Sequence, residues 1–388
     1  MAEAVIVSTA RTPIGRARKG SLVDVRPDDL LAFAIRSALD KVPELAAPDV
    51  CDVIAGCAAQ EGKQGGNIAR RAALLAGLPD SVPGTTVNRF CASSLQTIRM
   101  AFHAIAAGEG DAFVACGVES VSQYSGAPRD PDSQHPKLTG RGDGKIADVY
   151  ISMGMTAENV AVRFGVKRED MDRFAQRSQE RAVRSQSDGF FEREISAYTK
   201  ADGTVVCKDD GPRPESTLEA LRSLEPAFKP GGSVTAGNSC PLNDGAAAVV
   251  VMSASRAKEL GIRPRARIVA SAVSGIEPEI MGVGPIEAVK QVLARAHMTI
   301  DDIELMELNE AFAAQVLPVC EAVGMDPFSE RFNPHGGAIA LGHPFGMTGA
   351  RIMTTLLNGL EVEDRSIGLE TMCVGGGQGM AMIVERLN

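Results

Sequence analysis

One order of segments occurs twice along the chain, and it restricts the fold more than any other feature. Near the amino end, a strand-like run at 84–88 leads through a turn to an apolar helical stripe at 95–105 and a second strand-like run at 112–116. Near the carboxyl end, a strand-like run is followed by a glycine-rich turn, a helical stripe at 352–360 and a strand-like run at 366–372. β-Branched runs that alternate with helical spacing are typical of α/β proteins. We therefore expect two similar α/β halves.

The segment between these halves has a different character. Residues 125–144 are rich in turn-forming residues, and residues 155–182 predict one charged, amphipathic helix. An insertion of this kind commonly covers a site or an interface. The expected units are an N-terminal half at 1–117 with 242–266, a loop domain at 118–241 and a C-terminal half at 267–388.

Composition and charge argue against several classes of protein. A net charge of −9 disfavours binding to nucleic acid or to an anionic membrane, because both require a basic surface. No run approaches the ~20 apolar residues that span a bilayer, and the amino end does not resemble a secretory leader. Eight cysteines without a Cys-x-x-Cys pair predict neither a disulfide framework nor structural zinc. We expect a cytoplasmic protein with no bound metal.

Cys91 lies where a strand-like segment gives way to a helix. Backbone N–H groups and the helix dipole favour a thiolate there, and the thiolate is the nucleophilic form of cysteine. The alternative is a small buried hydrophobic residue, a common role for free cysteine. The position alone leaves both roles open.

Cys373 precedes a run of glycines that includes Gly375. Such a run lets backbone N–H groups approach a ligand and stabilise developing negative charge. The alternative is a turn that needs positive φ angles. A phosphate-binding loop is disfavoured, because no Gly-Lys-Ser/Thr follows.

Two further polar positions adjoin predicted secondary structure. We expect His343 to begin a helix, since Pro344 suits a first helical turn, although a hydrogen-bonded structural histidine is the alternative. Asn309 and Glu310 directly follow a predicted strand, where side chains reach a cleft in α/β proteins. Either residue could equally cap the next helix.

Together these segments resemble the four signature blocks of one enzyme family, the thiolases. The blocks, in the family's order, are Asn88-Arg-Phe-Cys91-Ala-Ser-Ser, Asn309-Glu310-Ala-Phe-Ala, Gly342-His343-Pro344-Phe-Gly-Met-Thr348-Gly and Cys373-Val-Gly-Gly-Gly-Gln-Gly. Flanking pieces such as Arg11-Thr12-Pro13 and Thr235-Ala236-Gly237-Asn238 match as well. The resemblance covers essentially the whole chain.

The resemblance implies a fold and a reaction. The family has two similar five-stranded α/β halves in a five-layer αβαβα arrangement, with an inserted loop domain that binds coenzyme A (CoA). Its members make or break a carbon–carbon bond between acyl groups carried as CoA thioesters. CoA and acyl-CoA are then substrates, and no cofactor is bound permanently.

The match also implies roles for single residues. Cys91 resembles the nucleophile that attacks the 3-keto carbon and becomes acylated. His343 resembles the histidine that activates it, Asn309 the residue that holds a water beside that histidine, and Cys373 the general acid and base. The backbone N–H groups of Cys91 and Gly375 are implied to form an oxyanion hole for the acyl-cysteine intermediates.

Contacts with substrate or CoA are expected from Met153, Arg222, Ser239, Cys240 and Phe312. One position departs from the family pattern, because Glu225 precedes Pro-Ala-Phe where many relatives carry a basic residue. Arg222 lies nearby and is the candidate substitute.

Several positions resemble the degradative branch of the family, namely Asn333-Pro334, Thr348 and Gln378. We expect thiolytic cleavage of 3-ketoacyl-CoA to acetyl-CoA and a shortened acyl-CoA, as in β-oxidation of fatty or related acyl chains. The alternative is a biosynthetic acetyl-CoA acetyltransferase that forms acetoacetyl-CoA. The family also implies a homodimer or homotetramer, with β-oxidation enzymes as candidate partners.

Three alternatives come from other classes of protein. A β-ketoacyl synthase shares the fold but has histidines where Asn309 and Cys373 stand. A non-catalytic acyl-CoA binding protein usually lacks one of the four catalytic positions, all of which are present here. A Cys–His hydrolase would leave Cys373 unexplained. Acyl chain length stays open.

Overall fold

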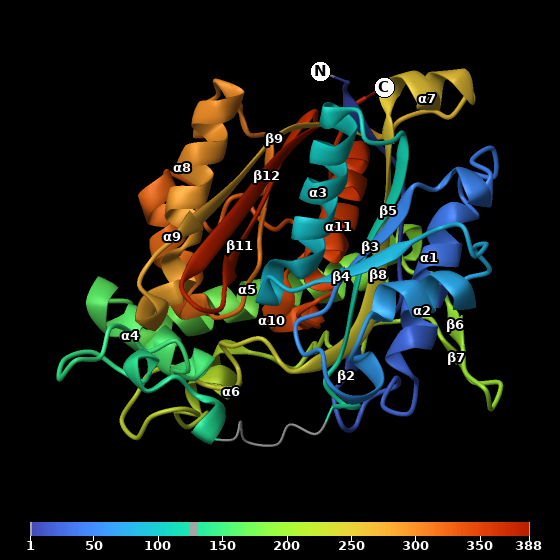
Figure 1. Ribbon diagram of the computed structural model, residues 1–388. Helices are drawn as coiled ribbons and strands as arrows, with labels where there is room; N and C mark the ends of the chain where they lie inside the picture. Colours follow the sequence, from blue (N-terminus) through green and yellow to red (C-terminus); the bar gives the residue numbers. More distant parts are fainter. Residues whose placement is uncertain (1, 125–130, 388) are drawn as a thin grey trace.

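The central strands are buried along their whole length, because helices cover both of their faces. β1 (Ala4–Arg11) and β8 (Asn243–Ser253) are completely buried. Figure 1 shows the computed structural model, in which residues 2–124 and 131–387 are described. Residues 1, 125–130 and 388 lie outside the described residues, so part of the expected loop domain and of its turn-rich segment does too.

A ten-stranded mixed sheet runs through both halves in the order β10-β11-β12-β9-β1-β8-β5-β3-β4, with β2 beside β8. Antiparallel pairs join β5, β8 and β1, whereas β3 and β4 pair in parallel at one edge. The remaining strands of the sheet are β2 (Gly15–Arg16), β3 (Asp52–Gly56), β4 (Gly84–Val87), β5 (Ala112–Ser120), β9 (Ala266–Gly275), β10 (Leu305–Leu308), β11 (Ile367–Val374) and β12 (Gln378–Arg386).

The two halves meet between β1 and β9, where the ladder contains the pairs Val5–Arg267 and Ile6–Ala266. The N-terminal half supplies five strands along the sheet, from β4 to β1. The C-terminal half supplies four, and a single parallel bridge between Met306 and Phe332 occupies the edge where a fifth strand would lie. The domain boundaries themselves stay a prediction.

The helices form three layers around the two halves of the sheet. α1 and α2 cover the outer face of the N-terminal half, α8 and α9 cover the outer face of the C-terminal half, and α3 packs against α11 between them (Figure 1). The expected five-layer αβαβα arrangement is therefore confirmed. The helices of these layers are α1 (Pro27–Leu39), α2 (Ile68–Leu75), α3 (Ser93–Ala107), α8 (Pro285–Ala296), α9 (Ala313–Val323) and α11 (Thr348–Val362), with α7 (Ala254–Glu259) between the halves in sequence.

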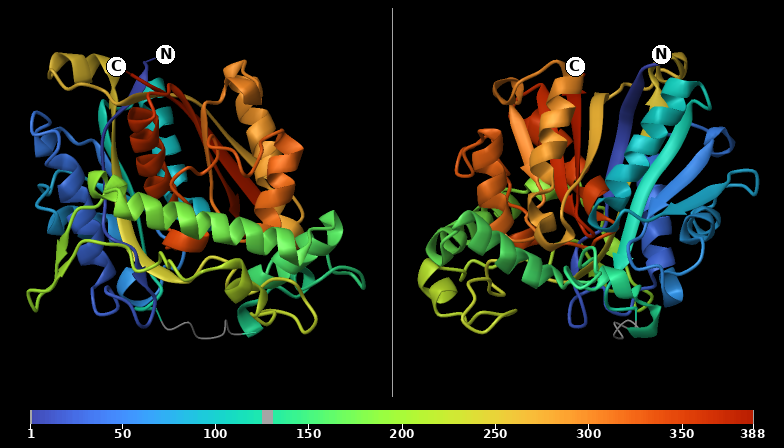
Figure 2. Two further views of the ribbon diagram at one scale, coloured as in Figure 1. Left: turned by 180° about the vertical axis from the view of Figure 1, so that it is seen from behind. Right: turned by 60° about the vertical axis from the view of Figure 1, so that its left-hand side comes forward.

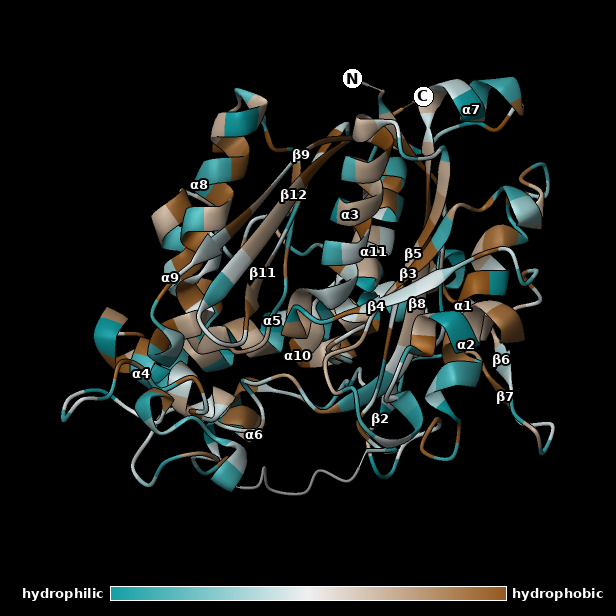
Figure 3. Cartoon of the chain, viewed as in Figure 1, coloured by the Kyte–Doolittle hydropathy of each residue, from teal (hydrophilic) through white to brown (hydrophobic). Residues whose placement is uncertain are grey.

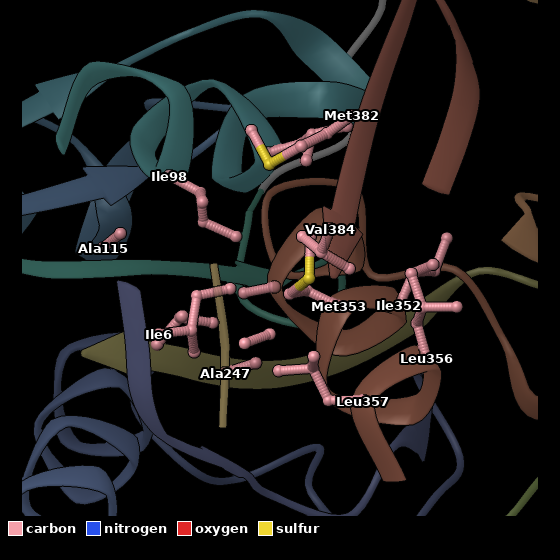
Figure 4. Packing of buried hydrophobic residues seen from close by; sticks show 14 of the residues in the cluster. Ile6, Ile98, Ala115, Ala247, Ile352, Met353, Leu356, Leu357, Met382 and Val384 are labelled. Carbon is pink, nitrogen blue, oxygen red and sulfur yellow. The ribbon is translucent and has the colours of Figure 1, made fainter. Parts of the chain in front are cut away.

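A continuous apolar core fills the space between the halves. Figure 4 shows Ile98 of α3, Met353 and Leu357 of α11, and Ile6 and Met382 of the sheet meeting there. Each of these five side chains is fully buried. Figure 3 shows the same division by hydropathy, with hydrophobic residues along the strands and hydrophilic ones on outer helices such as α7. In the described part of the chain, no helix has the length and apolarity that a membrane crossing requires.

The inserted segment lies across one end of both halves. The long helix α5 crosses the side that is at the back in Figure 1 and at the front in the left view of Figure 2. The single helix expected at 155–182 is wrong in one respect, because the chain breaks it at Gly165, whose φ is +65°. A residue in this left-handed conformation ends a helix, and glycine adopts it without strain. The elements of the segment are α4 (Met153–Phe164), α5 (Arg168–Ser187), α6 (Leu218–Arg222) and the hairpin β6 (Tyr198–Thr199) and β7 (Val205–Val206), with α10 (Ala338–Leu341) packed against α5.

Candidate active site

Cys91 lies in a single tight turn, Phe90–Ala92, between the end of β4 and the start of α3. Phe90 has a φ of +46°, which a bulky residue rarely adopts, and its N–H donates to Asn88 Oδ1 at 2.7 Å. Such backbone strain is often found at functional sites. The turn leaves Cys91 only 9% exposed, at the wall of a cavity of about 690 Å³.

The thiol of Cys91 is neutral in the resting site at pH 7. Burial raises the pKa of Cys91 to about 12, although hydrogen bonds from the backbone N–H groups of Gly375 and of Cys91 itself act to lower it. These are the two N–H groups expected to form an oxyanion hole. The structure therefore brings Gly375 of the C-terminal half to the sulfur of Cys91 in the N-terminal half.

His343 is buried, and its tautomer follows from its hydrogen bonds. Its Nδ1 lies 2.6 Å from Thr348 Oγ1, and the Thr348 hydroxyl donates to the carbonyl of Pro344 at 2.8 Å. A hydroxyl has one proton to donate, so Nδ1 of His343 must be the donor of the 2.6 Å bond. Burial lowers the pKa of His343 to about 3, so the ring is neutral with its lone pair on Nε2. That nitrogen is the candidate base.

The expectation that His343 begins a helix is wrong, since α11 begins at Thr348. Two side chains from the N-terminal half hold residues 342–347 out of the helix. Asn243 Oδ1 accepts the His343 N–H at 3.0 Å, and Glu119 Oε2 accepts the Gly346 N–H at 2.8 Å. The histidine is thus placed by tertiary contacts and not by its own helix.

Asn309 directly follows β10, as predicted, and its side chain points to the histidine. Its Nδ2 lies 3.4 Å from His343 Nε2, and its Oδ1 is buried without a hydrogen-bond partner in the described part of the protein. The alternative role as a helix cap is wrong, because Phe312 is the N-cap of α9 and no side chain caps that helix.

Cys373 lies at the end of β11 and is fully buried. Its Sγ donates to Gln315 Oε1 at 3.0 Å. Burial raises the pKa of Cys373 well above that of an ordinary thiol, and the nearby sulfur of Cys91 raises it further. The two thiols are therefore close neighbours, although 282 positions separate Cys91 from Cys373 in the chain.

A two-residue tether joins the nucleophile turn to the glycine turn. Arg89 Nη1 donates to Gln378 Oε1 at 2.8 Å, and Gln378 Nε2 donates to the Gly375 carbonyl at 3.3 Å. Gly376 and Gly377 have φ values of +76° and +82°, so the turn between β11 and β12 needs glycine, as the alternative interpretation held. Sequence reasoning gave no role to Arg89, although it lies in the block around Cys91, and it missed Gln315, which shows no local signal.

The predicted substrate and CoA contacts divide into three groups. Met153 lines the cavity beside Cys91. Ser239 and Phe312 form an isolated β-bridge, and Cys240 donates its N–H to the Ala311 carbonyl at 3.0 Å, so all three lie beside the Asn309 segment. Arg222 does not line that cavity.

Arg222 lies instead on the surface of α6. Its Nη2 is 2.6 Å from Glu169 Oε1, and both side chains are more than half exposed. The cavity also contains residues that sequence reasoning did not single out, including Gln60, Tyr150 and Phe345. The Phe345 ring contacts that of His343, with centroids 5.1 Å apart, and this contact connects the histidine to the cavity wall.

Sequence profiles agree with this geometry. The profile of the thiolase N-terminal domain matches residues 4–255, and that of the thiolase C-terminal domain matches residues 262–386. The chain belongs to the thiolase family. It is an acyltransferase of that family, and the four signature blocks are the segments that meet at the site.

Relatives and solved structures of other thiolases cover the full chain. A 3-ketoacyl-CoA thiolase from Idiomarina loihiensis is 46% identical over 394 residues, covering 100% of both chains. A β-ketoadipyl-CoA thiolase from Acinetobacter baylyi is 44% identical over 413 residues, again covering 100% of both. The crystal structure of the Bacillus anthracis acetyl-CoA acetyltransferase superposes with a TM-score of 0.91 at 37% identity, covering 100% of this chain and 99% of that one.

Proposed function

We propose that this thiolase cleaves 3-ketoacyl-CoA with CoA, releasing acetyl-CoA and an acyl-CoA shortened by two carbons. The observation that carries the proposal is the pair of buried thiols, Cys91 and Cys373, which come from different halves and lie near each other, with Cys91 at the wall of the cavity. One thiol suits nucleophilic attack, and the other suits proton transfer to carbon.

In the first half-reaction, Cys91 Sγ attacks the 3-keto carbon and its proton passes to His343 Nε2. The Nδ1–H bond to Thr348 leaves that nitrogen free to accept it. The carbon–carbon bond then breaks, and its electron pair forms the enolate of acetyl-CoA. Cys373 S–H protonates the enolate carbon, which leaves acyl-Cys91, a Cys373 thiolate and a protonated His343.

In the second half-reaction, CoA attacks acyl-Cys91 after giving its thiol proton to the Cys373 thiolate. Cys91 then leaves as a thiolate and recovers its proton from His343. The N–H groups of Cys91 and Gly375, which reach the Cys91 sulfur, suit the oxyanion of each tetrahedral intermediate at the acyl carbon. The unpartnered Oδ1 of Asn309 suits a water molecule beside the histidine, in support of the role expected from the family.

The degradative direction is supported by the names of full-length relatives, which include 3-ketoacyl-CoA thiolases and β-ketoadipyl-CoA thiolases. A second candidate function is formation of acetoacetyl-CoA, favoured by the structural neighbour described as an acetyl-CoA acetyltransferase. CoA is a substrate of either reaction.

We also propose that the loop domain at 118–241 binds CoA, because Met153 of this segment lines the cavity at Cys91. A homodimer or homotetramer is proposed from the family. A cytoplasmic location is proposed because the eight free thiols suit a reducing compartment. β-Oxidation enzymes stay proposed partners. Contact between Arg222 and CoA also stays a prediction.

The test is CoA-dependent cleavage of a 3-ketoacyl-CoA series, from acetoacetyl-CoA to long-chain substrates, with Cys91→Ala and the matched variant Cys207→Ala. Cys207 is exposed and takes no part in the proposed mechanism, so its variant should retain wild-type activity. Cys91→Ala should lose cleavage entirely. A preference for longer substrates would support degradation, and failure of the wild-type protein to cleave any member would refute the proposal.

A further inference from the structure

In the described part of the chain, Gln315 is the one side chain that forms a hydrogen bond with the Cys373 thiol. It lies in the first turn of α9, is fully buried, and places Oε1 3.0 Å from Cys373 Sγ. A thiol has one proton, and the amide oxygen is an acceptor, so the bond runs from Cys373 to Gln315. This bond points the proton of the general acid along a fixed direction.

The base of the Gln315 side chain is packed closely. Gly282 lies so close that a Cβ there would fall 2.8 Å from the Gln315 Cβ, nearer than real Cβ contacts allow. Val160 of α4 borders the same space, at 3.7 Å from that Cβ position. Close packing of this kind fixes the point from which the side chain extends to the sulfur of Cys373.

The other end of the amide has no partner. Gln315 Nε2 is buried and makes no hydrogen bond with any described residue. A buried N–H group without a partner is costly, and native proteins seldom retain one without a reason. Rotation of the terminal amide torsion would turn this nitrogen toward Cys373, because that torsion is broad and roughly two-fold.

We propose that Gln315 is the positioning residue of Cys373, accepting the thiol hydrogen bond through Oε1 and donating to the thiolate through Nε2 after proton transfer. The inference rests on the proposed function, since it concerns the carbon-protonating step of that reaction. In that step the S–H bond breaks, the proton forms a C–H bond with the enolate carbon, and the electron pair stays on sulfur. The thiolate is the species that an N–H donor stabilises.

One short segment would then govern both proton-transfer groups. Asn309 contacts His343 and Gln315 contacts Cys373, and six positions separate Asn309 from Gln315. A shift of residues 309–315 would alter both groups together.

The experiment separates the two kinds of chemistry in one protein. Deuterium uptake into the methyl group of acetyl-CoA in D₂O reports proton removal by Cys373. Exchange of labelled CoA with acetyl-CoA reports acyl transfer through Cys91. In that exchange Cys373 passes a proton to and from the thiol of CoA, and the α-proton is not used. The variants are Gln315→Met, which keeps the length of the side chain without the amide, and Gln315→Glu, which keeps an acceptor oxygen without the N–H donor.

We expect Gln315→Met to slow deuterium uptake by about 10- to 100-fold and to shift its pH profile to higher pH, as for loss of a hydrogen bond to a charged group. Gln315→Glu should slow uptake increasingly as pH rises, because a carboxylate opposes the thiolate. CoA exchange should slow less than deuterium uptake, because Cys373 there exchanges its proton with the thiol of CoA, which is a stronger acid than the α-carbon of acetyl-CoA. The control Gln291→Met, on the solvent side of α8 beside Glu287, should change neither rate.

Two results would overturn the inference while leaving the proposed function intact. One is wild-type deuterium uptake with an unchanged pH profile in both Gln315 variants. The other is an equal loss of both rates in variants that melt at the wild-type temperature, which would make Gln315 purely structural. Absence of thiolysis by the wild-type protein would instead refute the proposed function itself.

Discussion

At the scale of single residues, hydrogen bonds decide which proton each catalytic group holds. His343 and Cys91 are both neutral in the resting site, because burial lowers the pKa of the imidazole and raises that of the thiol. The proton of His343 is fixed on Nδ1 by Thr348, whose own proton is committed to the Pro344 carbonyl. Proton transfer from Cys91 to Nε2 therefore needs no prior rearrangement of the ring.

Thr348→Val tests this arrangement. Valine matches threonine in shape but removes the hydroxyl oxygen that accepts the His343 Nδ1–H. A buried Nδ1–H would then have no acceptor, which favours the tautomer with the proton on Nε2. We expect kcat/KM for thiolysis to fall by about 10- to 100-fold, equivalent to about 1.4–2.7 kcal/mol. Thr348→Ser restores the hydroxyl and should recover most of the activity. Steady-state kinetics that show a Val variant as active as wild type would contradict the tautomer assignment.

At the scale of elements, the site depends on turns that are held together across the two halves. The nucleophile turn before α3 and the glycine turn between β11 and β12 are joined by Arg89 and Gln378. Arg89 also donates to Gln96 of α3 at 2.9 Å, so the tether reaches into the helix that follows Cys91. The tether keeps the Gly375 N–H at the Cys91 sulfur.

Arg89→Met should loosen the glycine turn without emptying its space. We expect the rate of Cys91 acylation to fall by about tenfold, because the charge-assisted hydrogen bonds of Arg89 to Gln378 and Gln96 are lost, while the melting temperature changes little. The matched control is Arg99→Met, since Arg99 lies on α3, the helix that follows the nucleophile turn, but bonds to Ser271. Rapid-quench measurement of acyl-enzyme formation checks the outcome, and equal effects of the two variants would argue against the tether.

At the scale of the whole molecule, carboxyl groups are buried in the C-terminal half of the sheet. Glu307 of β10 and Glu370 of β11 face each other across the parallel ladder, and both are fully buried near Arg351 of α11. Burial raises the pKa of Glu307 to about 8 and that of Glu370 well above the usual value. The free-energy cost of removing water from two adjacent carboxylates exceeds the electrostatic stabilisation that one arginine supplies.

This cluster predicts how stability depends on pH. The pKa of Glu307 in the folded state, about 8, lies above the ordinary value of 4.5, so unfolding releases a proton between these limits. The contribution of Glu307 to the free energy of unfolding is complete below pH 4.5 and is lost as pH rises toward 8. Glu307→Gln keeps a neutral group at every pH.

We therefore expect the free energy of unfolding of Glu307→Gln, relative to wild type, to increase by about 1–3 kcal/mol between pH 5 and pH 8. Urea denaturation at both pH values measures this, with the exposed substitution Glu321→Gln as the control. A difference between Glu307→Gln and wild type that does not vary with pH would show that Glu307 is already ionised in the folded protein.

The sequence by itself determined the α/β class, the repeated order of elements and the four segments that carry the chemistry. Those features are local, because hydrophobic spacing and a cysteine, histidine or glycine in its motif are visible over a few neighbouring positions. The start of the helix after His343 and the break at Gly165 were mispredicted, although both are short-range features. The helix start after His343 is shifted because two distant residues override the local preference. Asn243 accepts the His343 N–H, and Glu119 accepts the Gly346 N–H.

Only the tertiary structure decided how the motifs combine. It placed Gly375 and Cys373 beside Cys91, set the tautomer of His343, and supplied Gln315 and Arg89 as partners, to which sequence reasoning had assigned no role. The physical reason is that these hydrogen bonds and the burial that shifts each pKa join segments from opposite ends of the chain. Periodicity along the sequence records which face of an element is buried, but not which distant side chain it meets.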